Sequence, residues 1–231
     1  MTSVWPILEP LLPRVAKPIQ YVGGELNSTV KDWDSASVRW ALMYPDAYEV
    51  GLPNQGVMIL YEVLNEIEDV LAERSYAIWP DLEALMRAAN VPHFSIDSHR
   101  PLGDFDLLGF SFSTELGYTN MLSALSLANI PLRSQQRTMS DPIVIAGGHA
   151  SFNPEPVADF IDVAVLGDGE EAVIAITNVV RDWIRVILHV LPGLSACQPF
   201  TLESNGFRGS IPFKGTNEFF IRGNPTTSSF E

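Results

Sequence analysis

Two glycine-rich turns carry the residue types best suited to hold a ligand. Gly147 and Gly148 end an apolar run and are followed by His149, and a second apolar run ends in Gly-Asp-Gly-Glu-Glu at 167–171. Because glycine has no Cβ atom, a bulky ligand can approach the backbone closely at the glycine pair. The same glycines would also make a tight turn from a strand into a loop. The residues alone leave both interpretations open.

The usual metal ligands do not form a convincing metal site. Cys197 is the one cysteine in the sequence, so the chain can form neither an internal disulfide nor a zinc or iron–sulfur site that needs several cysteines. His93 and His99 share a loop, but their spacing does not indicate a shared metal. His149 fits either a contact with a ligand or a neighbouring domain, or a capping role in an exposed loop. We therefore expect no metal site in this chain.

Composition excludes several classes of protein. The net charge is −14 at pH 7, whereas nucleic-acid binding needs a basic face. A hydrophobic content of 46% is typical of a globular protein. No apolar stretch reaches the roughly 20 residues that span a bilayer, and the first residues lack the basic segment and cleavage site of a secretory signal. We expect a cytoplasmic protein that binds neither nucleic acid nor membranes.

Apolar runs typical of buried strands alternate with helical patterns between residues 38 and 184. We predict main strands at 38–45, 75–79, 104–113, 142–148 and 160–169, a short edge strand at 91–97, and helices at 56–74, 81–90, 115–130 and 170–184. Strands that are apolar throughout indicate a parallel sheet with helices on both sides. About five main strands fit a flavodoxin-like, doubly wound α/β domain.

The chain divides into three predicted parts. Residues 1–37 are spaced by prolines and form an extension that packs against the domain, and residues 38–184 form the α/β domain itself. Residues 185–231 lose the acidic bias and gain Ser, Asn, Gly and Phe without a period, so we expect an irregular tail. One hypothesis is that this tail is a frameshifted or replaced end, which would make the chain an N-terminal fragment of a longer enzyme. The rival hypothesis is a natural stand-alone binding module.

A ligand of such a sheet is expected at the carboxyl ends of the strands, near the point where the strand order switches. The segments predicted to lie there are 46–56, 111–115, 147–153 and 167–171. These are the most polar and glycine-rich turns of the chain. The position of the two opening turns is therefore the position at which this fold binds ligands.

The residues at these turns resemble a known family. The segments 46-DAYEVG-51, 111-SFS-113 and 147-GG-148 are similar to the D-x-H-x-x-G, S-x-S/T and GG motifs of cobalamin-binding domains. The stretch 147–171 resembles the GG-x-H…PE…D…GEGE signature of the cobalamin-binding-type domains that precede a radical S-adenosylmethionine (SAM) barrel. The resemblance covers about residues 10–184 and points to an uncharacterised branch of radical SAM proteins.

This resemblance implies a binding site for cobalamin. The nucleotide tail of the cofactor would enter the crevice of the sheet against the glycine pair, with a serine hydrogen-bonding near it and Gly51 allowing close approach. The implied cofactor-binding positions are Asp46, Tyr48, Gly51, Ser111, Ser113, Gly147, Gly148, His149, Gly167, Gly169 and Glu170.

One position departs from the family pattern. The histidine that coordinates cobalt from below falls at Tyr48, and a free phenol stays protonated below a pKa of about 10. Either cobalamin binds without an axial side chain, or the domain keeps the fold and no longer binds cobalamin.

The chain also lacks the C-x-x-x-C-x-x-C motif that holds the [4Fe–4S] cluster of radical SAM enzymes. The resemblance implies that the parent enzyme cleaves SAM to a 5′-deoxyadenosyl radical, and that cobalamin, if bound, relays a methyl group. We expect this chain to be inactive alone and to work with a radical SAM barrel, either as a missing domain or as a partner chain.

Two alternatives stay open. One is a protein-interaction domain with no small ligand, which Tyr48 favours. The other is a binder of a different nucleotide or of flavin, against which stands the absence of a G-x-G-x-x-G motif.

Overall fold

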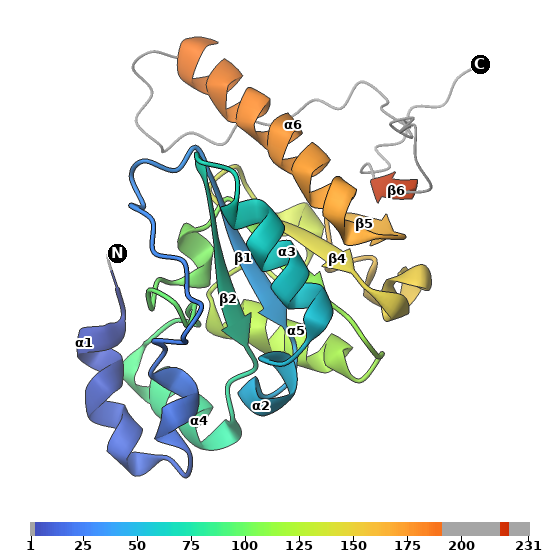
Figure 1. The fold of residues 1–231 in the computed structure, drawn as a ribbon. Coiled ribbons are helices and arrows are strands. Elements are labelled where there is room, and N and C mark those ends of the chain that lie inside the picture. Colours follow the sequence, from blue (N-terminus) through green and yellow to red (C-terminus); the bar gives the residue numbers. More distant parts are fainter. Residues whose placement is uncertain (1–2, 191–217, 222–231) are drawn as a thin grey trace.

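A computed structural model describes residues 3–190 and 218–221, and the side chains of residues 3–184. Its centre is a sheet in the order β2-β1-β3-β4-β5-β6 (Figure 1). The strands are β1 (Val38–Tyr44), β2 (Val70–Tyr76), β3 (Leu107–Ser111), β4 (Ile143–Gly147), β5 (Val163–Leu166) and β6 (Glu218–Ile221). Strands β1 to β5 pair in parallel, and β6 runs antiparallel to β5. The predicted flavodoxin-like order of five parallel strands is confirmed.

Helices cover both faces of the sheet. The α-helices are α1 (Trp5–Leu8), α2 (Tyr48–Gly51), α3 (Gln55–Asn65), α4 (Pro80–Ala89), α5 (Gly117–Leu127) and α6 (Gly169–Val190). Short 3₁₀ helices are η1 (Glu9–Arg14), η2 (Pro18–Tyr21), η3 (Leu102–Asp104), η4 (Ser134–Gln136), η5 (His149–Phe152) and η6 (Glu155–Val157). In Figure 1, α3 and α6 lie on the near face and α5 lies behind the sheet.

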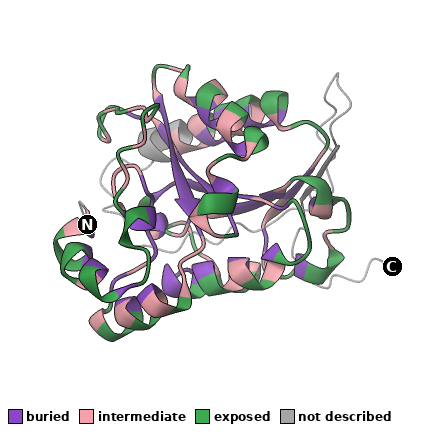
Figure 2. Cartoon of the chain, turned by 60° about the horizontal axis from the view of Figure 1, so that its bottom comes forward, coloured by how far each residue is buried: buried purple, intermediate pink, exposed green. Residues whose placement is uncertain are grey.

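The alternation of β1 explains why the strand is apolar after the half-buried Arg39. Trp40 and Leu42 pack in one cluster with residues of α3 and α6, while Ala41 and Met43 pack in another with residues of α5. Because successive side chains point to opposite faces, a strand covered on both sides is apolar along most of its length. Figure 2 shows the buried strands between helices whose outer faces are exposed.

The N-terminal extension packs on α4, as the blue segment of Figure 1 shows. Its residues Val4, Leu8 and Leu12 share a buried cluster with Leu82 and Met86 of α4. The expectation that the extension packs against the domain is therefore met in the described residues, although its boundary at residue 37 stays a prediction.

The predicted helix 56–74 is wrong beyond Asn65. The helical spacing of apolar residues continues to Leu71, but α3 ends at Asn65 and the chain enters β2 at Val70. The side chain of Asn65 donates to the carbonyl of Ala72 at 3.0 Å and accepts from its N–H at 3.1 Å. These bonds satisfy backbone groups of an edge strand, which no local pattern can reveal.

The predicted strand 75–79 is consequently shifted to Val70–Tyr76. All seven residues of β2 are buried, including Glu73 and Arg74. The predicted edge strand at 91–97 is also wrong, since that segment forms only an isolated bridge between Phe94 and Pro101. It lies against the outer edge of β2 instead, where the N–H of Ile96 donates to the carbonyl of Arg74 at 2.7 Å.

The predicted boundary at residue 184 falls inside α6, which continues to Val190. Part of the predicted irregular tail, Glu218–Ile221, forms β6. The remaining residues of the tail, including Cys197, lie outside the described residues. The frameshift hypothesis stays a hypothesis.

Candidate functional site

The carboxyl edge of the parallel strands brings the predicted site residues to one end of the sheet. Asp46 follows β1, Ser113 follows β3, His149 follows β4 and Gly167 follows β5, and all four are exposed. Strands that run in parallel necessarily end at the same edge, so segments far apart in sequence become neighbours here. This edge is therefore the candidate site, as the sequence predicts.

At the switch in strand order, the edge is crossed by hydrogen bonds. The chain leaves β1 toward β2 on one side, while β3 lies on the other side of β1. The hydroxyl of Tyr44 donates to Ser113 Oγ at 3.1 Å, and Asn120 Nδ2 donates to the carbonyl of Pro45 at 2.9 Å. These bonds tie the loops after β1 and β3 to each other and to α5.

The two adjacent glycines have different environments. Gly148 has a φ of 91°, and a Cβ atom there would lie 2.6 Å from the carbonyl oxygen of Phe112. It is therefore required by the turn itself. A Cβ atom on Gly147 would meet nothing within 4 Å, so this glycine borders open space. Only Gly147 leaves room of the kind that a ligand would use.

Gly51 and Gly169 are instead packing positions. A Cβ atom on Gly51 would lie 2.4 Å from the Tyr76 ring, and one on Gly169 would lie 3.0 Å from Leu60. In this structure, α2 therefore rests on the ring at the end of β2, and α6 begins in contact with α3. Neither glycine faces an opening.

Tyr48 begins α2, and its phenol is already engaged. Its hydroxyl donates to a carboxylate oxygen of Glu25, and its ring meets that of Tyr76 edge to face with centroids 5.4 Å apart. Burial, with a smaller contribution from Glu25, raises the pKa of Tyr48 to about 12. The phenol is neutral at physiological pH, so Tyr48 does not offer cobalt the anionic oxygen that would replace a histidine.

The remaining predicted residues also lie at this edge. Ser111 ends β3 half-buried, and Glu170 is exposed in the first turn of α6, where a carboxylate is favoured by the helix dipole.

A groove of about 370 Å³ opens beside these residues, between α4 and α5. It is lined by Asp46, Ala47, Ala77, Ile78, Trp79, Pro80, Glu83, His93, Asn120, Ser123, Ala124 and Leu127. Such a volume is within the range of ligand pockets. Apart from Asp46 and His93, the sequence did not single out these residues, because they come from four separate segments of the chain that only the fold brings together.

His93 lies buried at this groove. Its Nε2 donates to the carbonyl of Tyr76 at 3.0 Å, and burial lowers its pKa to about 4. His99 lies elsewhere, with Nε2 at 2.8 Å from the carbonyl of Tyr21. The two histidine rings thus bind different segments of the chain. Among residues 3–184, no group of three or more His, Cys, Asp and Glu side chains could hold a metal ion.

Within the described ranges, no helix is long and apolar enough to cross a membrane.

Comparison with known proteins gives one result. A family model described as "Radical SAM proteins, N-terminal" matches residues 56–188, which begin in α3 and end within α6. No curated protein and no solved structure matches the chain. The matched segment includes β2 to β5 and the loops that carry Ser113, Gly147 and Gly167.

Proposed function

We propose, from the premise that this chain belongs to the radical SAM proteins and carries their N-terminal domain, that the carboxyl edge of its sheet binds cobalamin without a coordinating side chain. The observation that carries the proposal is the combination of strand order and open glycine. The order β2-β1-β3-β4-β5 places the switch point at the edge that holds Gly147, where a Cβ atom would meet nothing within 4 Å.

The residues present fit this cofactor at the edge but not at the axial position. Ser113 and Gly167 are exposed beside Gly147 and can border a large planar ligand. Tyr48 is held by Glu25 and Tyr76 and stays a neutral phenol. We therefore infer that Ser113, Gly147 and Gly167 would hold the cofactor at this edge and that Tyr48 would not coordinate it. When bound, cobalamin supplies a cobalt centre that can carry a methyl group.

The radical chemistry is proposed to lie outside this chain. Radical SAM proteins hold a [4Fe–4S] cluster by cysteine thiolates, and Cys197 is the one cysteine in this sequence. A barrel domain or a partner chain would have to supply the cluster and bind SAM. A cytoplasmic location is part of the proposal, because a chain without a pair of cysteines is typical of a reducing compartment.

Titration of the full chain with hydroxocobalamin tests the proposal. We expect saturable, stoichiometric binding by calorimetry and visible absorbance. Replacing Gly147 by leucine should weaken binding at least tenfold while leaving the melting temperature within about 2 °C, since the added side chain meets no protein atom close to its Cβ. Replacing Tyr48 by histidine should shift the visible spectrum of the bound cofactor. Absence of binding up to high micromolar cobalamin would refute the proposal.

A second candidate function is a docking domain with no small ligand. The engaged phenol of Tyr48 and the contact between Gly169 and Leu60 favour it, because both leave the conventional cobalamin positions filled by protein. Here the groove between α4 and α5 would receive the catalytic barrel. Ser123 is exposed in this groove, so Ser123→Arg should weaken a complex with a radical SAM barrel polypeptide without lowering stability. An unchanged complex by size-exclusion chromatography would exclude the groove as the docking site.

A further inference from the structure

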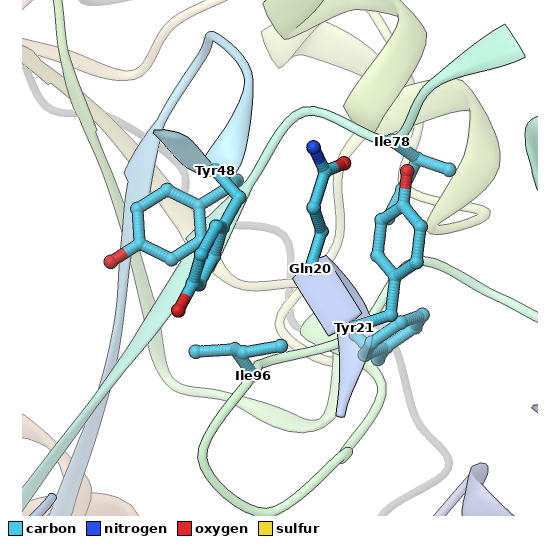
Figure 3. A pocket seen from close by; sticks show the side chains of 7 residues that line it. Gln20, Tyr21, Tyr48, Ile78 and Ile96 are labelled. Carbon is cyan, nitrogen blue, oxygen red and sulfur yellow. The ribbon is translucent and has the colours of Figure 1, made fainter. Parts of the chain in front are cut away.

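The groove between α4 and α5 has a small cavity beside it, and Ile78 lines both. Figure 3 shows the cavity, in which the amide oxygen of Gln20 points toward Ile78 and Tyr21 and away from the hydroxyl of Tyr48. The cavity has about 10 Å³ of free space, whereas the groove has about 370 Å³. Of the two, only the groove has room for a small organic molecule.

The N-terminal extension holds the aromatic wall of this groove in place. The N–H of Trp79 donates to the hydroxyl of Tyr21 at 3.2 Å. The ammonium group of Lys17, which does not line the groove, lies 4.7 Å from the centroid of the Trp79 ring. A tryptophan ring attracts cations through its electron-rich face, and this ring already accepts one from the extension. Trp79 is therefore a fixed aromatic wall of the kind that favours a cationic ligand.

The lining of the groove is electronegative. It includes the carboxylates of Asp46 and Glu83 and no Lys or Arg side chain. Glu83 pairs with Arg87, outside the lining, at 2.7 Å. The ion pairs among residues 3–184 do not include Asp46. His93 adds no positive charge at neutral pH, because burial lowers its pKa to about 4. The groove thus carries an uncompensated negative charge at Asp46.

The free polar atoms of the lining are mostly hydrogen-bond acceptors. Asn120 donates its amide nitrogen to a backbone carbonyl of the loop after β1, which leaves the amide oxygen as an acceptor. Asp46 accepts a backbone N–H with one carboxylate oxygen, which leaves the other. The Nε2 of His93 is a donor, so its Nδ1 is an acceptor, and Nδ1 is buried without a partner in the described part of the chain. A ligand with several N–H donors matches this set.

Two other classes of ligand fit the groove less well. An anion would need free N–H groups at the start of α4, but Pro80 has none. The N–H of Leu82 bonds to the side chain of Asp81 at 2.8 Å, and the N–H of Glu83 bonds to a backbone carbonyl at 2.8 Å. A metal ion would need more ligands, because residues 3–184 contain no group of three or more His, Cys, Asp and Glu side chains that could hold one.

We propose that this groove binds a small organic cation, a primary ammonium group carried on an apolar body. The ammonium group donates to Asp46 and to the amide oxygen of Asn120, at the carboxyl end of β1. The apolar body lies along Trp79 and Leu127. The site is separate from the proposed cobalamin contacts at Gly147 and Gly167, which do not line the groove, so either site can be present without the other.

Calorimetric titration of the full, cobalamin-free chain with 2-phenylethylammonium chloride tests the proposal. We expect saturable binding with a Kd of about 1 mM or lower. The neutral analogue 2-phenylethanol should bind at least about tenfold more weakly, because it lacks the charge that Asp46 attracts. Backbone amide NMR shifts should change at Ala47, Ala77 and Ser123, which locates the ligand in the groove. No binding up to about 10 mM, or equal binding of the two compounds, would overturn the proposal.

Two matched variants separate this site from general charge attraction. Asp46→Asn should weaken binding of the amine about tenfold and leave the melting temperature unchanged, because the asparagine oxygen can still accept the N–H of Ala47. Glu66→Gln removes the same charge from an exposed position at the end of α3 and should change binding less than about twofold. Equal effects of the two variants would refute the site.

The same ammonium chemistry can come from a free amine or from a lysine side chain of a partner chain. Nα-acetyl-lysine methylamide distinguishes these sources in the same titration. Weaker binding than that of 2-phenylethylammonium would assign the groove to a free amine with an aromatic body, and equal or tighter binding would assign it to a lysine side chain.

Discussion

Replacing Asp97 by alanine should strongly destabilise the protein. Asp97 and Arg74 form an ion pair at 2.6 Å, with side chains that are 5% and 1% exposed. The carboxylate also accepts from the backbone N–H of Arg74 at 2.7 Å and from Ser28 Oγ at 3.0 Å. The carboxylate of Asp97 therefore contacts the backbone of β2, the guanidinium of Arg74 and a residue of the N-terminal extension.

The magnitude follows from the burial. Without Asp97 the guanidinium of Arg74 keeps the Ser28 hydroxyl at 2.8 Å and the ring of Tyr61, but no carboxylate neutralises it. Breaking a buried pair by removing one partner costs about 3–5 kcal/mol. For a chain of this size, that corresponds to a fall in melting temperature of about 6–20 °C.

Equilibrium unfolding in urea, followed by tryptophan fluorescence, measures this loss. The matched control is Asp159→Ala, which removes the partner of Arg133 in a pair at 3.1 Å whose side chains are 57% and 52% exposed. Exposed pairs contribute about 0–1 kcal/mol, so the control should change stability little. A loss below about 1 kcal/mol for Asp97→Ala, similar to the control, would refute the argument that burial makes this pair important.

Three other changes test further parts of the structure. The pKa of His93 is lowered to about 4, so the stability linked to it is present above pH 6.5 and is lost as pH falls toward 4. The difference in unfolding free energy between pH 7.5 and pH 4.5 should therefore be smaller in His93→Gln than in the parent protein, by about 3 kcal/mol. Burial raises the pKa of Glu73, so its contribution is present below the ordinary pKa of 4.5 and is lost as pH rises through the raised value; Glu73→Gln should therefore be more stable than the parent at pH 7 by urea unfolding, and an equal or lower stability would contradict this sign. Gly51→Ala should lose about 1–3 kcal/mol, because the added Cβ atom lies 2.4 Å from the Tyr76 ring; Gly147→Ala, with nothing within 4 Å, is its control, and calorimetric melting should separate the two.

The layers of the fold were predictable because they depend on local patterns. Within the runs 104–113 and 142–148, residues 107–110 and 143–146 carry no polar side chain, which is typical of a strand covered on both faces. Their alternation with helical patterns implies right-handed crossovers and a parallel sheet. The same order places the turns at 46–51, 111–113, 147–149 and 167–171 at one edge, so the location of the candidate site followed from sequence. The family match over residues 56–188 agrees with the predicted membership of the radical SAM proteins.

The roles of individual residues at that edge were not predictable. Gly147 and Gly148 are adjacent and identical in type, yet one borders open space and the other is required by a turn against Phe112. The difference arises from the path of β3, a strand that lies more than thirty residues earlier in the chain. Likewise, the engagement of Tyr48 by Glu25 depends on where the extension returns to the domain.

Sequence by itself determined the α/β class, the radical SAM family and the edge that carries the candidate site residues, because apolar periodicity and short motifs are local properties. Tertiary structure alone decided that Glu73 and Arg74 belong to a strand. Two adjacent charged residues in a helical pattern suggest an exposed helix. Burial of Glu73 and Arg74 in a strand is tolerated because Asp97 and Ser98, from another segment, bind their charged groups. These partners come together only when the chain has folded. The positions of β2, the extension and Tyr48 are therefore stabilised by contacts of the whole domain and not by local sequence.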